Sequence, residues 1–296
     1  ARRTGLARIE AALTTPAGQR LTKALALPVQ VNDPEIARTS RFGLADGATL
    51  TLSRDVFDGL REGTGTATLA FGPYARLDVP GLMERLDRYP YGCTEQVTSA
   101  AMPLLYFPAV GASVGTGQDV EPRIAHAIRR ILSNQGASGG FGLWYPGGGD
   151  FWLDAYVADF LSRARALGHE VPRIAFDRAL DTLVNRVNGA PEIGPDTGGG
   201  VDVAYALMVL AREGRARIGD LRYYADAKAR DFGTPLALAQ LGAALALYGD
   251  QPRADAMFAR AQDLLEDRRA AGADDGWRAD YGTDLRDAAG LLTLAS

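Results

Sequence analysis

The sequence has a single cysteine and only two histidines among its 296 residues. One cysteine excludes an internal disulfide, and one cysteine with two distant histidines provides no set of ligands for a transition metal. The acidic pairs lack the spacing of a calcium loop. The triple glycines at 147–149 and 198–200 follow no predicted strand, so they do not match a phosphate-binding loop. We therefore expect neither a metal nor a cofactor.

Long apolar runs and clusters of one charge are also missing. Lysine and arginine total 32 against 36 acidic residues, which gives a net charge of −4, and the lysines and arginines are spread evenly along the chain. Without a basic stripe, we expect no nucleic-acid partner and no anionic membrane surface. We find no signal peptide, lipidation motif or membrane-spanning run. Because the sequence starts at Ala1 without Met and stops at Ser296 within a helical pattern, we expect it to be an excised piece of a longer protein.

Two domains are predicted, because the hydrophobic period changes once along the chain. From Leu6 to about Phe71 apolar and polar residues alternate, which is typical of strands. The predicted strands are 7–13, 21–31, 49–53 and 65–71, and Pro16-Ala17-Gly18 turns the first pair into a hairpin. Residues 1–72 are therefore expected to form an all-β segment, half of a small sandwich.

From Pro73 onward the apolar residues recur every three or four positions, which predicts helices through residues 73–296. The expected helices are 79–86, 93–105, 120–134, 152–167, 172–188, 201–212, 220–229, 234–248, 252–265 and one from 283 onward. Short connections between helices indicate stacked antiparallel pairs. The helices at 201–212 and 236–247 are apolar nearly all round, so we place them in an inner layer. The pattern alone leaves open whether the pairs form an open solenoid or a closed ring.

The stretch Tyr89-Pro-Tyr-Gly-Cys-Thr-Glu-Gln96 contains the only cysteine. Side chains at positions i and i+3 share a helix face, so Sγ of Cys93 and the carboxamide of Gln96 can meet. If the sulfur displaces ammonia, an internal thioester forms, which is an activated acyl group. The predicted position at a helix N-terminus suits acyl chemistry, because the free N–H groups there stabilise a developing oxyanion.

These residues resemble the thioester motif of the α2-macroglobulin and complement family, in its bacterial branch. Three further stretches also resemble bacterial members of this family: Gly140-Phe-Gly-Leu-Trp144, Trp152-Leu-Asp-Ala-Tyr-Val157 and Asp220-Leu-Arg-Tyr-Tyr-Ala-Asp226. The resemblance implies a mainly α fold, an incomplete α/α-toroid of helical hairpins, preceded by part of a CUB-like β-sandwich. It also implies a periplasmic protein of bacterial defence, anchored to the inner membrane as a lipoprotein through a segment outside this sequence.

The implied function is a broad-spectrum protease trap. Other domains of the full-length protein would expose the thioester after proteolysis, and Gln96 would then be acylated onto a lysine of the protease while Cys93 leaves as a thiol. Such a reaction is single-turnover inhibition, so we expect no enzyme. Complement members that prefer hydroxyl targets carry a histidine before the helix that here resembles 201–212, and this sequence has none there. We therefore expect amine acceptors over hydroxyl acceptors.

A thioester must be shielded from water, and aromatic residues near the motif are the candidates. Tyr89 and Tyr91 flank the motif, while Trp144 and Trp152 lie in or after a glycine-rich run at 136–149, which is either a loop able to fold over the site or simply a long connection. Core packing remains an equal interpretation for Tyr91. Glu95 points elsewhere on the helix, and we give it an orienting or capping role.

Two alternatives from other classes remain open. α/α-Toroids also host enzymes, and a cysteine at a helix N-terminus could be a catalytic nucleophile. That interpretation requires a nearby base and usually paired carboxylates, which the sequence does not offer. The second alternative is a binding scaffold that keeps the fold but no longer forms the thioester.

Overall fold

The computed structural model describes residues 5–29, 36, 38–67, 69, 92–108, 120–190, 192–272, 278 and 280–296. The chain divides into two units, residues 1–76 and residues 77–296. The boundary predicted near Gly72 and the helix predicted at 79–86 lie outside the described residues.

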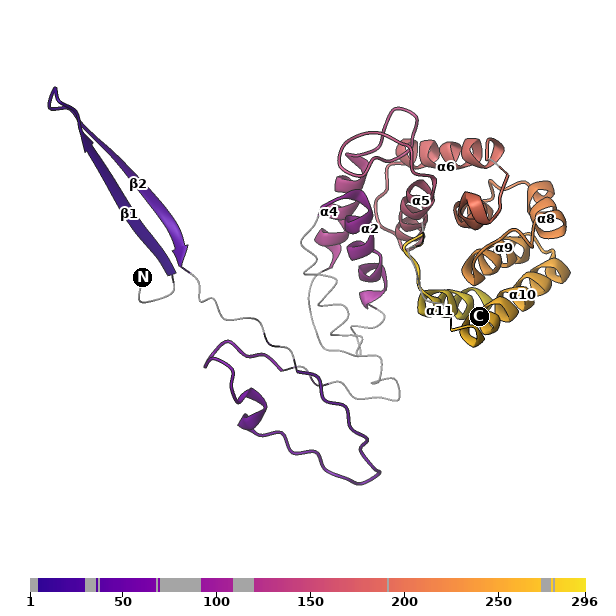
Figure 1. Cartoon of the computed structure of the whole chain (residues 1–296), viewed down its shortest axis with the longest axis horizontal. Helices are drawn as coiled ribbons and strands as arrows, with labels where there is room; N and C mark the ends of the chain where they lie inside the picture. The colour runs from indigo at the N-terminus through magenta and orange to yellow at the C-terminus, as the bar shows by residue number, and fades with distance from the viewer. Residues whose placement is uncertain are drawn as a thin grey trace. The chain divides into compact units, whose positions relative to one another are not determined.

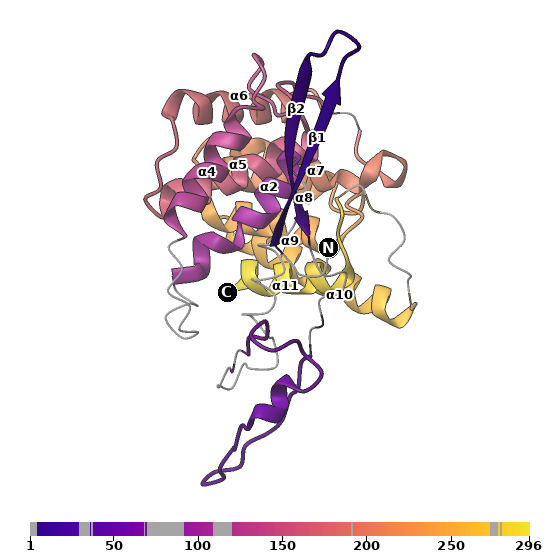
Figure 2. The ribbon, with the colours of Figure 1, turned by 90° about the vertical axis from the view of Figure 1, so that its left-hand side faces the viewer.

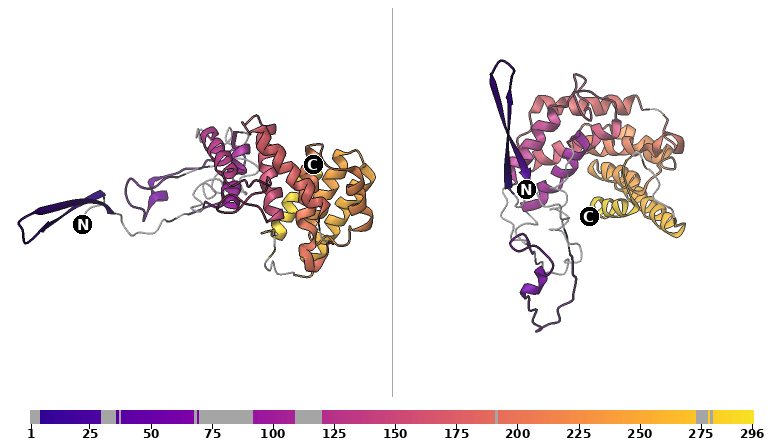
Figure 3. Two further views of the ribbon diagram at one scale, coloured as in Figure 1. Left: turned by 90° about the horizontal axis from the view of Figure 1, so that it is seen from above. Right: turned by 60° about the vertical axis from the view of Figure 1, so that its left-hand side comes forward.

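The first unit contains an antiparallel hairpin of β1 (Gly5–Thr14) and β2 (Arg20–Val29), drawn in Figure 3. Its register places Ile9 opposite Leu25 and Leu13 opposite Leu21, so one face of the hairpin is apolar. The predicted turn closes the strands, with Gly18 at a φ of 79° that favours glycine. The predicted hairpin is thus confirmed.

The strands predicted at 49–53 and 65–71 are wrong for the described residues of those segments. Residues 49–53, 65–67 and 69 form no strand, and the regular element between them is a 3₁₀-helix at Arg54–Phe57. No described residue between 5 and 69 is buried. An alternating pattern specifies a strand only when a partner pairs with its backbone and a core covers its apolar face.

The second unit is mainly helical in its described part, which confirms the predicted fold class of a mainly α chain with a small β segment. Its helices are α2 (Thr94–Ala101), α4 (Glu121–Leu132), α5 (Phe151–Ala166), α6 (Arg173–Asn188), α7 (Val201–Arg212), α8 (Ile218–Ala227), α9 (Pro235–Leu247), α10 (Gln251–Ala270) and α11 (Asp284–Ala295). Two 3₁₀-helices, Pro103–Tyr106 and Pro195–Gly200, join them. No helix in the described part of the chain is both long and apolar enough to cross a membrane.

The helices form two layers. Packing runs from α2 to α5, α7, α9 and α11 in the inner layer, and each outer helix packs on an inner one, as α10 does on α9. Figure 1 shows α10 and α11 beside α9, and Figure 2, in which α7 is labelled, turns the same unit by 90°. The contacts place α7 between α5 and α9. The helices α7 and α9 are buried nearly all round, as their composition predicts. Closure into a complete ring stays a prediction.

Helix ends follow local chemistry. Oδ1 of Asp150 accepts from the N–H of Leu153 at 2.9 Å to cap α5, and Oγ1 of Thr234 accepts from Ala237 at 3.1 Å to cap α9. The helix predicted at 93–105 stops at Ala101. Pro103 has no N–H to continue the helical hydrogen bonds, so a 3₁₀ turn follows.

Candidate functional site

Cys93 is the N-cap residue of α2, and Gln96 is the third residue of that helix. The two side chains form a reciprocal capping arrangement. Oε1 of Gln96 accepts a hydrogen bond from the backbone N–H of Cys93 at 3.3 Å, and the Cys93 side chain faces the N–H of Gln96. The thiol is free of disulfides and only 6% exposed. The sulfur and the carboxamide are therefore held together on one side of a helix N-terminus.

Thr94 ties the motif to the glycine-rich loop. Its backbone N–H donates to the carbonyl of Leu143 at 2.8 Å, and its hydroxyl donates to the carbonyl of Gly142 at 2.5 Å. The same hydroxyl accepts from Nδ2 of Asn134 at 2.8 Å. Thr94 is 1% exposed, so these hydrogen bonds are shielded from water. Loss of one of them would leave a buried polar group without a partner and would lower the stability of the fold. The loop therefore packs against the motif, which favours the first of its two predicted interpretations over a simple connection.

A buried carboxylate anchors the same loop from the other side. Oδ1 of Asp154 accepts from the N–H of Phe141 at 2.7 Å, and Oδ2 pairs with Arg186 at 3.2 Å. Burial raises the pKa of Asp154, against the opposing effects of the Phe141 hydrogen bond and the Arg186 charge. The loop at 136–149 is thus fixed to α2 at one point and to α5 at another.

A cavity of about 270 Å³ lies beside the motif. All five inner helices contribute to its wall, together with the segment that precedes α11. The lining residues are Glu95, Ser99, Trp152, Tyr156, Val201, Tyr205, Thr234, Leu236, Ala237, Gln240, Asp280, Tyr281 and Arg286. The cavity therefore lies where the inner helices converge.

Aromatic rings form one wall of this cavity. Trp152 stacks on Tyr156 at 4.9 Å between ring centroids, and Tyr281 meets Trp152 edge-on at 5.3 Å. Tyr205 is tilted at 6.4 Å from both Trp152 and Tyr156. Burial raises the pKa of Tyr156 to about 12 and that of Tyr205 well above its ordinary value, so both phenols stay protonated at neutral pH.

Polar groups line the remaining wall. Ser99 donates to Oε1 of Glu95 at 2.6 Å and shares a hydrogen bond with the hydroxyl of Tyr156 at 3.0 Å. Asp280 is paired with Arg286 and with Arg278, the latter at 2.8 Å. Glu95 belongs to no ion pair among the described residues. It is therefore the one carboxylate of the lining whose charge no described cation balances.

Tyr281 reaches the cavity from a strained backbone. Its φ of 54° makes it the one non-glycine residue with a positive φ in the described part of the chain. The pKa of Tyr281 is raised by burial first and then by the charges of Asp150, Glu95 and Cys93. Tyr281 is nearly 190 positions away from the motif in the sequence, yet it lines the same cavity as Glu95.

The predicted site residues fall into three groups. Cys93, Gln96 and Glu95 lie together at the start of α2, and Trp152 lies in the cavity beside them. Trp144 follows the loop residue that bonds to Thr94, but its side chain is 59% exposed and does not line the cavity. Tyr89 and Tyr91 lie outside the described residues. Glu95 bonds to Ser99, whereas the capping contacts belong to Gln96.

Neither histidine lines the cavity. His126 is exposed on α4, and Nδ1 of His169 lies 2.9 Å from Oε1 of Glu121. The backbone N–H of His169 donates to the carbonyl of Ala164 at 3.0 Å, just after the end of α5.

Sequence reasoning missed Thr94, Ser99, Tyr156, Tyr205 and Tyr281. The spacing of Trp152 and Tyr156 by four positions on one helix could have revealed a shared face. Tyr205 and Tyr281 come from distant elements, and no local pattern connects them to the motif.

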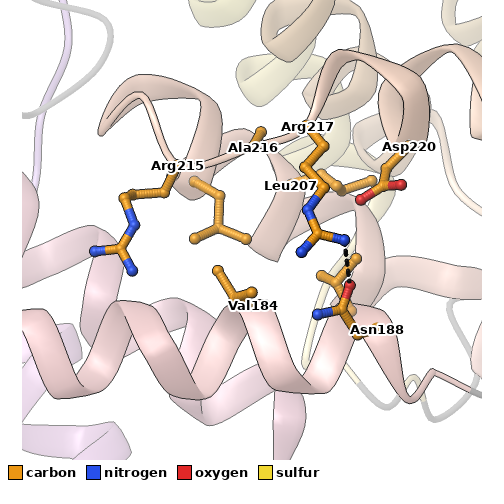
Figure 4. Close-up of a pocket in the computed structure, with 9 residues that line it drawn as sticks. Val184, Asn188, Leu207, Arg215, Ala216, Arg217 and Asp220 are labelled. Atoms are coloured by element: carbon orange, nitrogen blue, oxygen red, sulfur yellow. Dashed lines mark hydrogen bonds between the residues drawn. The ribbon is translucent and has the colours of Figure 1, made fainter.

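A second hollow lies between α6, α7 and the start of α8, and Figure 4 shows it. Its volume of about 10 Å³ holds at most about one water molecule. Val184 and Leu207 make its wall largely apolar, and Arg217 donates to Oδ1 of Asn188 at 3.5 Å across its edge. It offers no nucleophile. The described residues also contain no group of three metal-ligating side chains.

The arrangement at α2 can be compared with known proteins. The chain is 31% identical to α2-macroglobulin of Escherichia coli strain K12 over 274 residues, which are 87% of this chain and 16% of that protein. A crystal structure of native E. coli α2-macroglobulin, spanning domain MG7 to the C-terminus, matches 98% of this chain with a TM-score of 0.68 and 30% identity. The chain is homologous to part of the bacterial α2-macroglobulins.

A further α2-macroglobulin, that of Salmonella reacted with methylamine, matches 99% of this chain with a TM-score of 0.73 and 29% identity. This chain covers 48% of the E. coli fragment and 20% of the Salmonella chain. Its aligned region spans about one sixth of the length of the curated E. coli α2-macroglobulin. No family model matches the sequence. The resemblance predicted from the motif is thus confirmed by relatives along nearly the whole chain.

Proposed function

We propose that this chain is the thioester-bearing part of an α2-macroglobulin-like protease inhibitor that captures proteases covalently. The reciprocal arrangement of Cys93 and Gln96 carries the proposal, because it holds the sulfur and the carboxamide on one side of a helix N-terminus. Displacement of ammonia from Gln96 by the Cys93 sulfur would give the internal thioester. The amides at the start of α2 would stabilise the oxyanion formed when a nucleophile attacks it.

The relatives support proteases as targets and amines as acceptors. A matching E. coli α2-macroglobulin was activated by trypsin and another by porcine elastase, and the Salmonella protein was reacted with methylamine. We propose the same classes for this chain, with a lysine of the protease as acceptor. The reaction is single-turnover, because the acyl group is consumed. We further propose that the helical unit is an incomplete α/α-toroid and that residues 1–72 are part of a CUB-like domain. Trp152 and the loop at 136–149 would shield the thioester from water, and the protein would be periplasmic.

The two alternatives receive less support. A cysteine enzyme needs a base within hydrogen-bond reach of the thiol. The described contacts of the Cys93 side chain lie within its own helix turn, and neither histidine lines the cavity. A binding scaffold that no longer forms the thioester would keep the same contacts around Cys93 and Gln96. It would differ from the proposed inhibitor only in whether the thioester forms.

Intact mass tests the proposal. A formed thioester lowers the mass of the protein by one ammonia. Methylamine should then add its own full mass, which leaves the protein one methylene group heavier than the uncyclised form, and should free one thiol. The variants Cys93→Ala and Gln96→Glu should show neither change, whereas Gln262→Glu, on the exposed side of α10, should behave as the wild type.

The choice of acceptor is a second test: acylation of a lysine peptide should exceed acylation of glycerol. An unchanged mass in full-length protein, or faster labelling of glycerol, would contradict the proposal.

A further inference from the structure

The cavity beside the motif has the composition of a site for an organic cation. Trp152, Tyr156, Tyr205 and Tyr281 form an aromatic wall. Aromatic faces attract alkylammonium groups through their quadrupoles, and the methylenes of a lysine side chain pack well on such rings. The cavity volume of about 270 Å³ is sufficient for one such side chain.

The charge balance of the lining favours a cation. Asp280 and Arg286 neutralise one another within an ion-pair cluster that also contains Arg278 and Asp287. Glu95 is left with only a neutral partner, Ser99. The lining therefore carries one negative charge that a ligand could balance.

A second observation also points to a ligand. The side chain of Gln240 is in the wall of the cavity and the residue is only 6% exposed, yet its amide makes no hydrogen bond with any described residue. The amide of Gln240 is therefore open to a partner inside the cavity; among the described residues, the fully buried side-chain atom without a hydrogen-bond partner is Nε of Arg286, in the same wall. An ammonium group in the cavity would give the amide oxygen of Gln240 a donor.

We infer that this cavity is the acceptor subsite of the thioester, which binds the side chain of an incoming lysine or another primary alkylammonium between the aromatic wall, Glu95 and Gln240. The inference rests on the proposed function for its chemical step. Its position supports this use, since Glu95 in its lining directly precedes Gln96 in α2.

Aminolysis of the thioester would begin with a proton transfer. The bound ammonium first transfers one proton to Glu95, which gives a neutral amine and a protonated carboxyl. The amine nitrogen attacks the carbonyl carbon of residue 96, a carbon–nitrogen bond forms, and the carbon–sulfur bond to Cys93 breaks. The departing sulfur takes the second proton from nitrogen. The products are an amide, a free Cys93 thiol and one proton that Glu95 returns to water.

Binding can be measured without the thioester. In the Cys93→Ala protein, the indole resonance of Trp152, assigned with Trp152→Phe, should shift saturably with Nα-acetyl-lysinamide. Nα-acetyl-norleucinamide, which lacks the amino group, should bind at least about tenfold more weakly. Adding Glu95→Gln should weaken binding of the lysine derivative about tenfold, and Gln240→Met should also weaken it. Glu266→Gln, on the exposed face of α10, is the matched control.

The reaction gives a second measurement. In thioester-containing protein, the rate constant for the lysine derivative is divided by that for hydroxylamine, which is uncharged at neutral pH. Glu95→Gln should lower this ratio about tenfold. Equal binding of the lysine and norleucine derivatives, or an unchanged ratio, would overturn the inference. If instead the Cys93→Ala protein binds the lysine derivative and the wild type forms no thioester, the proposed function fails while the cation site stands.

Discussion

Thr94 shows how a single buried hydroxyl can fix the position of the Cys93–Gln96 motif. It joins α2, the loop carbonyls at Gly142 and Leu143, and the amide of Asn134. Its neighbours Cys93 and Gln96 would carry the chemistry, but their position relative to the loop depends on Thr94. The motif predicted the reactive pair, whereas the role of the residue between them became visible only from its contacts.

Thr94→Val keeps the shape of the side chain but leaves the Asn134 amide and the Gly142 carbonyl without the hydroxyl as a partner. We expect the free energy of unfolding to fall by about 1–3 kcal/mol. Thr94→Ser keeps the hydroxyl and should cost less. Urea unfolding of the three proteins measures the difference, and equal stability of the Val variant and the wild type would contradict this account.

At the scale of elements, a buried carboxylate joins two inner helices. Asp159 of α5 pairs with Arg163 at 2.8 Å and with Arg212 of α7, and it accepts from the hydroxyl of Tyr205 at 2.8 Å. Burial acts to raise the pKa of Asp159, but the charges of Arg212 and Arg163 outweigh it and hold the pKa below its ordinary value. The position of Tyr205 in the cavity therefore depends on an ion-pair cluster behind it.

Asp159→Asn should destabilise the helical unit by about 2–4 kcal/mol at pH 6, because two arginines lose a buried partner. A lowered pKa in the folded state means that the contribution is present above the unfolded pKa of about 4 and is lost as the pH falls through the folded value. The stability difference between wild type and variant should therefore shrink from pH 6 to pH 3. Urea midpoints measured along this range test the sign, and a difference that grows in acid would refute it.

The glycine-rich loop owes its path to backbone geometry that the sequence only suggests. Gly139 has a φ of 94°, and an added Cβ would lie 2.4 Å from the carbonyl oxygen of Arg178. Gly147, in the same loop, has open space around the corresponding position out to 3.8 Å. The composition predicted a loop or a long connection at 136–149. That Gly139 is the glycine at which this loop approaches α6 closely is decided by the position of α6.

At the scale of the whole molecule, the two units differ in how they are stabilised. The helical unit has a continuous buried core that includes Phe141, Phe160 and Phe176. The described part of the first unit contributes no buried residue, and an isolated two-stranded hairpin is at best marginally stable in water.

We therefore expect residues 77–296 alone to unfold cooperatively, with a midpoint within about 2 °C of the whole chain. Residues 1–76 alone should show no cooperative transition. Calorimetry of the two fragments and the whole chain provides the test. A large loss of stability in the helical fragment would show that the first unit contributes to its core.

The sequence by itself determined the class of the fold, the first hairpin, the helical layering and the placement of Cys93 and Gln96 within one turn, because these follow from hydrophobic period and from spacing along a helix. The limits of the helices 201–212 and 172–188 agree with α7 and α6 to within a residue. Strands at 49–53 and 65–71 were predicted wrongly, since pairing partners are not a local property. Only the tertiary structure decided that Tyr205, Gln240 and Tyr281 share a cavity with Glu95, because contacts between distant helices depend on packing that no local pattern records.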